Sequence, residues 1–374
     1  MIAREFVPSR LEFARKRRGI PRTKLAESVG MNSKTIQRWE SGLGEPGEDQ
    51  VAALAEHLRI LPTFFYEPEI EALPDAAVSF RALSKMSASE RDAATAAGRL
   101  GVEIVRWMES RFKLPDPDVP SLTGWKPELA AEALRERWDL GGGLVRHLVP
   151  TCELHGVRIL AIASDYRSVD AFSFFDAGTP FAFLNTSKTA ERIRFDLAHE
   201  LGHLVMHGEH ECPQGREAEH EANDFASAFL MPRDSLLAAG LFGATVDDVI
   251  RAKSKWQVSA MALARRLNAL ELLTDWGYRS LCVELSKRGF RSREPGSQIP
   301  RESSQVLRKI LAALRSDSLT PRRIGANFGL PLSEFNSYLA GLVVVSEDGF
   351  GEGNATGIHA RPSLQVIRGD YKAP

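Results

Sequence analysis

Hydrophobic and polar positions follow a helical period along most of the chain. Apolar residues recur every three or four positions within residues 8–66, 86–113, 124–155, 187–207 and 216–230, as an amphipathic helix requires. Two β-branched and aromatic runs, 157–163 and 180–184, are bounded by turn formers and predict strands. We therefore expect an α+β fold that is mainly α, with one small sheet.

Breaks in this pattern indicate domain boundaries. Prolines at 115, 117 and 120 end the helix of 86–113, and residues 286–303 are rich in Arg, Gly, Ser and Pro, as linkers are. A chain of 374 residues is also too long for one ordinary core. The expected units are a first domain at 1–70, a helical connector and linker at 71–122, a second domain at 123–285, a linker at 286–303, and a C-terminal helical domain at 304–374 with a loose tail from Ser346.

Composition excludes several classes of protein. Hydrophobic residues make up 43% and charged residues 26% of the chain, which is globular usage and excludes a disordered or collagenous chain. No apolar run is long enough to span a membrane, and the N-terminus is too charged for a signal peptide. Three widely spaced cysteines do not form a disulfide framework. We expect a cytoplasmic protein without a membrane partner.

Positive charge is concentrated at the N-terminus, although the whole chain has a net charge of only −1. Residues 1–38 hold ten Lys or Arg against three Glu. Such a field on a small module favours a polyanion partner, most often nucleic acid. The alternative is a basic face that is merely solvated.

A helix–turn–helix pattern accompanies this charge. Residues 23–28 predict a short helix, Val29–Met31 a tight turn, and Asn32 or Ser33 the cap of a second helix that runs through Trp39. The outward side chains of the second helix are of types that reach bases and phosphates. We expect DNA contacts from Ser33, Lys34, Thr35, Gln37 and Arg38.

Several positions of this region agree in order and spacing: Leu25-Ala26, Gly30, Ile36, Trp39-Glu40-Ser41-Gly42, Pro46 and Leu54-Ala55. Together they resemble the XRE-type, lambda-repressor-like helix–turn–helix domain over residues 8–66. The resemblance implies a five-helix DNA-binding domain, and because such domains often dimerise on two-fold sites, a homodimer is an expectation. Arg22 stands where the family often has Gln, and we expect it to contact a phosphate. The alternative is that the module binds protein.

A weaker echo of the same pattern occurs at residues 319–331. It predicts either a second helix–turn–helix or, as we favour, an ordinary helical cap that holds or senses a partner.

Residues 187–207 predict a helix that is buried on nearly all sides. A cap cluster stands at Asn185–Ser187, and Glu200 is the only formally charged residue between Leu197 and Gly208. His199 and His203 lie one turn apart on one face, so their imidazoles can bind one ion. This pattern is typical of catalytic Zn²⁺, which keeps a position open for water beside three protein ligands. Glu200 is placed to take the proton of that water; the alternative is a hydrogen-bonded pair of core histidines.

A third ligand is expected from the helix at 216–230, where Glu217, Glu219, His220 and Glu221 are all candidates. Periodicity does not choose among them, because Glu219 and Glu221 flank opposite edges of the apolar stripe. His207 is about 12 Å along the helix from His199, too far for the same ion. We expect His207, His220 and Asp224 to lie behind the ligands as hydrogen-bonding partners.

Three segments carry a second resemblance: 192–207 around His-Glu-Leu-Gly-His, Glu221–Ala226 and Leu230-Met231-Pro232. They resemble the ImmA/IrrE family of bacterial and phage zinc metallopeptidases, and Phe172–Phe174 and Phe183–Ser187 match segments before its metal-binding helix. The resemblance covers about 145–235 and implies a zincin-like domain. It also implies that the Glu before Ala-Asn, here Glu221, completes the zinc site with His199 and His203. Members of the family cleave or inactivate repressor proteins.

The sequence therefore predicts a zinc-dependent endopeptidase joined to a DNA-binding domain. Its substrate is expected to be a regulatory protein of repressor or antitoxin type, with Glu200 as general base. The predicted strands 157–163 and 180–184 can offer an edge for pairing with an extended peptide. The alternative is a transcription regulator without proteolytic activity, whose zinc fold serves as a sensor or a protein-binding surface.

Overall fold

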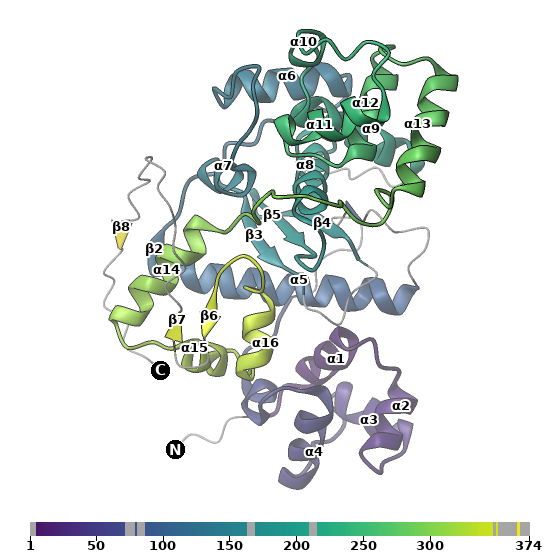
Figure 1. The fold of residues 1–374 in the computed structure, drawn as a ribbon. Helices are drawn as coiled ribbons and strands as arrows, with labels where there is room; N and C mark the ends of the chain where they lie inside the picture. The colour runs from purple at the N-terminus through teal and green to yellow at the C-terminus, as the bar shows by residue number, and fades with distance from the viewer. Residues whose placement is uncertain are drawn as a thin grey trace.

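The computed structural model describes residues 5–71, 87–162, 169–208 and 215–344 in full, and the backbone of 79–80, 345–346, 349–350 and 365–366. A helical N-terminal domain, a sheet with helices on both faces and a C-terminal helical module follow one another along the chain (Figure 1). The prediction of an α+β fold that is mainly α is confirmed. No helix of the described residues is long and apolar enough to cross a bilayer.

Within the described residues 5–71, the N-terminal domain forms four α-helices and one 3₁₀ helix: α1 (Pro8–Arg17), α2 (Arg22–Ser28), α3 (Ser33–Glu40), α4 (Glu48–Leu58) and η1 (Pro62–Tyr66). The fifth helix of the expected five is therefore the 3₁₀ helix. Asn32 caps α3 as predicted, because its side chain accepts a hydrogen bond from the amide of Thr35 at 2.8 Å. Leu25, Ile36 and Leu54 are fully buried between the helices.

The sheet has the strand order β1–β4–β5–β3, formed by Ser79–Phe80, Ala171–Asp176, Thr179–Leu184 and Arg158–Ala161. Strand β3 is parallel to β5, whereas β4 is antiparallel to β5 and to β1. Strand β5 thus lies between β4 and β3. On the outer edge of β3, the amide of Ala161 donates a hydrogen bond of 2.9 Å to the carbonyl of Tyr338. The expectation that β5 could offer an edge to a peptide is wrong, because both its edges are paired.

Helix α5 (Ala88–Glu109) covers one face of the sheet (Figure 1). It approaches closely because Gly98 and Gly101 face phenylalanine rings; a Cβ on Gly101 would lie 2.7 Å from the ring of Phe183. Alternation along β4 sends Phe172 and Phe174 toward α5 and Ser173 toward the opposite face.

The opposite face of the sheet carries α8 (Ala190–Met206), with α9 (Arg216–Leu230) packed beside it. Further helices surround this pair: α6 (Pro127–Arg137), α7 (Leu148–Leu154), α10 (Arg233–Leu237), α11 (Val246–Trp256), α12 (Ala260–Ala269) and α13 (Asp275–Lys287).

The C-terminal module is formed by α14 (Gln305–Ser316), α15 (Pro321–Asn327) and α16 (Leu332–Ser337). Its turn repeats that of the N-terminal domain: Gly30 has φ 67° and Gly329 has φ 65°. The following residue closes each turn alike, since Met31 donates to the carbonyl of Ala26 at 2.8 Å and Leu330 to that of Gly325 at 2.9 Å. Residues 319–331 therefore do form part of a second helix–turn–helix.

This second helix–turn–helix packs against the first domain. The amide of Leu61 donates to the carbonyl of Gly329 at 2.8 Å, and a Cβ on Gly329 would lie 2.4 Å from Cα of Phe64. Glu334 on α16 binds Arg17 at 2.5 Å and Arg18 at 2.6 Å. Because α16 is covered in this way, this second helix–turn–helix is packed against the first domain. The expectation that the module holds or senses a partner stays a prediction.

Residues 286–303, predicted as a linker, are fastened to the helices that they cross. Glu294 binds Lys253 at 3.0 Å, and Ser297 hydrogen-bonds Glu191. Glu302 forms an ion pair with Arg194 on α8. It also accepts a hydrogen bond of 2.7 Å from the amide of Val149, at the start of α7. This segment is a brace across the start of the α8 helix, which its loop-like composition did not indicate.

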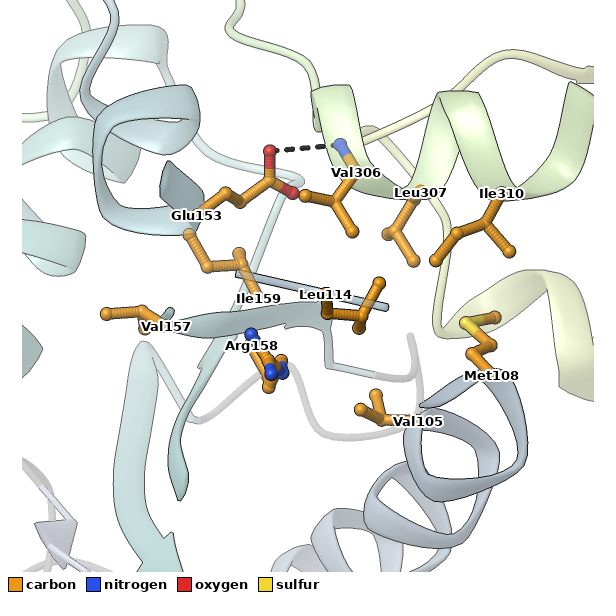
Figure 2. A pocket seen from close by; sticks show the side chains of 10 residues that line it. All are labelled: Val105, Met108, Leu114, Glu153, Val157, Arg158, Ile159, Val306, Leu307 and Ile310. Carbon is orange, nitrogen blue, oxygen red and sulfur yellow. Dashed lines mark hydrogen bonds between the residues drawn. The ribbon is translucent and has the colours of Figure 1, made fainter. Parts of the chain in front are cut away.

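A water-sized cavity of about 20 Å³ lies where β3, α5 and α14 meet (Figure 2). Its lining is mostly aliphatic, but Glu153 enters it and accepts hydrogen bonds from the amides of Gln305 at 2.8 Å and Val306 at 3.2 Å. Burial raises the pKa of the Glu153 carboxyl to about 7. The carboxylate thus caps the start of α14 and ties the C-terminal module to α7.

The predicted tail from Ser346 lies largely outside the described residues. Two short backbone pairings are described there: β6 (Val345–Ser346) with β7 (Gly349–Phe350), and β2 (Phe112–Lys113) with β8 (Gln365–Val366).

Candidate metal site and DNA-binding helix

Helix α8 carries the residues for which metal chemistry was predicted. It begins after Thr189, whose hydroxyl accepts a hydrogen bond from the amide of Arg192 at 3.3 Å. The prediction that Asn185–Ser187 caps this helix is wrong. The side chain of Asn185 instead accepts a hydrogen bond from the amide of Ser187 and closes a separate turn before the helix. Every residue from Leu197 to Met206 is buried, as the sequence pattern predicted.

His199 and His203 face each other on one side of α8. Their Nε2 atoms are 3.0 Å apart, and their exposed fractions are 0% and 3%. Two imidazoles at this distance in a buried setting need a shared hydrogen or a shared cation.

Glu219 from α9 completes the cluster. Its Oε1 lies 3.3 Å from Nε2 of His203, and its Oε2 lies 3.5 Å from Nε2 of His199. These three residues form the group of possible metal ligands found among the described residues. Although burial by itself raises the pKa of the Glu219 carboxyl, hydrogen bonds and charges from both histidines lower it to about 2. Glu219 is therefore an anion at neutral pH.

The dimensions of the cluster fit a zinc-sized ion. Tetrahedral bonds of 2.0–2.1 Å would place neighbouring ligand atoms about 3.3 Å apart. The two imidazole nitrogens are 3.0 Å apart, and each has a different oxygen of the Glu219 carboxylate near that distance: Oε1 lies 3.3 Å from Nε2 of His203 and Oε2 lies 3.5 Å from Nε2 of His199. Two nitrogens and a carboxylate are also a donor set of catalytic zinc sites, whereas magnesium and calcium prefer oxygen ligands.

Glu221, which the family resemblance implied as third ligand, lies elsewhere. Its Oε2 is 3.0 Å from Nε2 of His207, outside the cluster of His199, His203 and Glu219. Successive residues turn by about 100° on a helix, so Glu219 and Glu221 project to different sides of α9. The structure thus groups Glu219, and not Glu221, with the two histidines. Periodicity left this choice open, because which edge of α9 faces the histidines depends on how the two helices cross.

Gly202 explains how close α9 comes to the histidines. A Cβ at this position would lie 3.0 Å from the ring of Phe225 and 3.2 Å from Cα of Ala222. The glycine between the two histidines thus lets the backbones of α8 and α9 approach. This approach brings the Glu219 carboxylate within reach of both imidazoles.

The predicted neighbours of the site separate into two groups. His207 is 4% exposed, and its Nδ1 lies 2.9 Å from Nδ1 of His203. His220 has an exposed side chain, and Asp224 forms a surface ion pair with Arg265 at 3.7 Å. Of the three, the structure brings His207 to the histidine row and leaves the other two on the surface.

Glu200 is completely buried beside the cluster. The hydroxyl of Ser173 on β4 donates a hydrogen bond to its Oε2 at 2.7 Å. Ser173 itself is 1% exposed. From the sequence, Ser173 enters only as part of a segment that resembles the family. A signal was present, however: a small polar residue between two phenylalanines on a strand points to the opposite face from its neighbours.

The residues predicted to contact DNA lie on or near α3. Lys34, Gln37 and Arg38 are exposed, whereas Ser33 and Thr35 are half-buried at the start of the helix. Arg22 pairs with Glu40 and lies 3.6 Å from Glu12. Its expected phosphate contact therefore competes with two carboxylates.

Much of the N-terminal positive charge is used inside the protein. Arg15 binds Glu40 at 2.5 Å, and Arg17 and Arg18 bind Glu334. Arg10 is 8% exposed and donates to the carbonyl of Pro68 at 2.7 Å. The charge count of residues 1–38 therefore overstates the field that a polyanion would meet.

Comparison with protein families assigns both regions. Residues 152–268 match the model of the IrrE N-terminal-like domain, a peptidase family, and residues 11–65 match a helix–turn–helix model. The first match includes α8 and α9, and the second includes α2 and α3. No curated protein matches the sequence significantly.

Proposed function

Because a helix–turn–helix domain and an IrrE-type peptidase domain occur in this one chain, we propose that it is a zinc-dependent endopeptidase directed by a DNA-binding domain. The observation that carries the proposal is the cluster of the buried His199 and His203 with the half-buried Glu219, next to the buried Glu200. A site that was purely structural would have no need for a buried carboxylate next to its ligands.

His199, His203 and Glu219 would hold the zinc ion. Bound there, zinc supplies a Lewis acid that lowers the pKa of water and polarises a peptide carbonyl. Glu200 takes the proton of the attacking water and returns it to the leaving amine. Ser173 holds the Glu200 carboxylate in place through its hydrogen bond at 2.7 Å. The surrounding apolar residues of α8 keep bulk water away from these charges.

The DNA-binding part of the proposal rests on α3. In helix–turn–helix domains the second helix of the motif enters the major groove, and here α3 presents Lys34, Gln37 and Arg38 to solvent. We propose these residues, with Ser33, Thr35 and Arg22, as the contacts to DNA. The homodimer expected from this domain type stays a prediction.

The substrate that fits this combination is a regulatory protein of repressor or antitoxin type. A DNA-binding domain concentrates the peptidase where such proteins act, which raises their effective concentration. The competing function is a regulator that binds metal and protein without cutting.

The experiment is a cleavage assay with a zinc-loaded chain and the product of the neighbouring gene, with new N-termini identified by mass spectrometry. Glu200→Gln should bind zinc as the wild type does and lose cleavage. Glu217→Gln, which changes an exposed glutamate on α9, is the matched control and should cut normally. Cleavage by zinc-loaded Glu200→Gln at the wild-type rate would refute the role of Glu200. Zinc binding and DNA binding without any cleavage product would favour the regulator.

A further inference from the structure

Two hydrogen bonds connect His203 to a carboxylate on α9. Nδ1 of His203 lies 2.9 Å from Nδ1 of His207, and Nε2 of His207 lies 3.0 Å from Oε2 of Glu221. The side chain of His207 is 3% exposed, whereas that of Glu221 is 39% exposed. The chain of contacts therefore runs from the buried His203 to a carboxylate that reaches the protein surface.

The position of each proton along this chain follows from chemistry. Nε2 of His203 faces His199 and Glu219 and must offer a lone pair if it is to bind a metal. The proton of neutral His203 is then on Nδ1 and is donated to Nδ1 of His207. His207 in turn carries its proton on Nε2 and donates it to Glu221. Each contact thus has one donor and one acceptor, and the Glu221 carboxylate favours this set of tautomers over the reverse.

We propose that His207 and Glu221 are positioning residues for metal binding: they hold the ring of His203 in the orientation and tautomer in which Nε2 carries a lone pair for zinc. This inference rests on the proposed metal site and adds a role for two residues outside it. It also gives the two glutamates of α9 separate tasks, since Glu219 faces the ion and Glu221 orients a ligand.

Neither residue is placed to be a ligand. Nδ1 of His207 faces Nδ1 of His203, which is the ring nitrogen of His203 that points away from the cluster. Nε2 of His207 faces the carboxylate of Glu221. A hydrogen-bonded carboxylate behind a ligating histidine fixes the ring and makes it a better donor, and its removal typically weakens metal affinity about 10–100-fold. Here an additional imidazole stands between the histidine and the carboxylate.

The test is the zinc dissociation constant, measured by competition with a chromophoric chelator. Glu221→Gln and His207→Phe should each weaken zinc binding about 10–100-fold. The double variant should bind zinc about as tightly as the single variant with the larger loss of affinity, because both substitutions interrupt the same chain of hydrogen bonds. Glu217→Gln is the matched control with unchanged affinity. Glu219→Gln removes a ligand and should weaken binding far more than either.

A second readout is the visible spectrum of the cobalt-loaded protein. Both variants should shift the absorption bands while keeping the intensity of a four-coordinate site, since the ligands remain and their orientation changes. Because Glu221 is partly exposed, Glu221→Gln should fold normally and carries the test if His207→Phe does not fold.

The outcomes separate this inference from the proposed function. Wild-type affinity and spectrum in Glu221→Gln would overturn the positioning role while leaving the metal site intact. A loss of zinc as complete as that of Glu219→Gln would also overturn it, because Glu221 would then be a ligand. A wild-type chain that binds no metal would overturn the proposed site and this inference together.

Discussion

Arg17 and Glu334 form a buried ion pair with an N–O distance of 2.5 Å, although 317 positions separate them along the chain. Arg18 binds the other oxygen of the same carboxylate at 2.6 Å. Through this contact α1 of the DNA-binding domain is fixed to α16 of the C-terminal module. It adds to the packing of α1 on α5, which also holds the first domain in place.

Glu334→Gln should therefore loosen the N-terminal domain. The substitution keeps the shape of the side chain but removes the charge opposite Arg17, which is 2% exposed. Breaking a buried pair in this way costs about 3–5 kcal/mol. Denaturant unfolding should report this loss, with Glu56→Gln on the exposed side of α4 as control. Equal stability of the two variants would show that the pair contributes nothing to docking.

The same pair gives stability a defined pH dependence. Burial tends to raise the pKa of Glu334, but the charges of Arg17 and Arg18 outweigh it and lower that pKa below its usual value. A carboxyl with a lowered native pKa stabilises the fold fully above its unfolded pKa of about 4.3 and loses this contribution as the pH falls through the native value. The difference in unfolding free energy between wild type and Glu334→Gln should shrink below about pH 4. A difference that grows on acidification would contradict the assignment.

Ser173→Ala should slow cleavage without releasing zinc. The hydroxyl holds the Glu200 carboxylate, and a hydrogen bond to a charged group contributes about 1.5–3 kcal/mol, which corresponds to a rate loss of about 10–100-fold. The measurements are kcat/KM on the identified substrate and the zinc content of the same sample. Unchanged kcat/KM would mean that Glu200 is positioned without Ser173.

Gly202→Ala should damage the metal site through packing alone. The added methyl would meet Phe225 at 3.0 Å and Cα of Ala222 at 3.2 Å, so α8 and α9 must move apart and carry Glu219 away from His203. Overpacking of this kind costs about 1–3 kcal/mol, and zinc affinity should fall with it. Ala198→Gly on the same helix tests whether a general loss of helix stability has the same effect, and it should leave zinc affinity near the wild-type value.

Lys34→Ala should weaken binding to DNA of any sequence. Lys34 is exposed on α3, and each lost phosphate contact lowers the slope of log K against log salt by about 1. A fluorescent duplex titrated at several salt concentrations measures this slope. Lys287→Ala, which removes an exposed lysine far along the chain on α13, should leave it unchanged; equal slopes for both variants would exclude Lys34 from the interface.

Local patterns predicted much of this molecule because they report contacts within one element. Asn32 as the cap of α3 and the burial of α8 around His199 and His203 follow from spacing along one helix. The place of Glu219 could not be predicted in this way, since it depends on the approach of two helices at Gly202. Nor could the brace at 286–303, whose Glu302 meets Arg194 108 positions away. The positive charge available to DNA is likewise smaller than the count of Lys and Arg in residues 1–38 predicts. Arg17 and Arg18 bind Glu334 on α16, a partner that lies far along the chain.

The central claim is that His199, His203 and Glu219 converge on one zinc ion. Anomalous diffraction at the zinc absorption edge, from crystals of the zinc-loaded chain, locates that ion directly. The account predicts one strong peak about 2.0–2.1 Å from Nε2 of both histidines and from a carboxylate oxygen of Glu219. A peak bound by Glu221 in place of Glu219, or no peak beside His199 and His203, would contradict it.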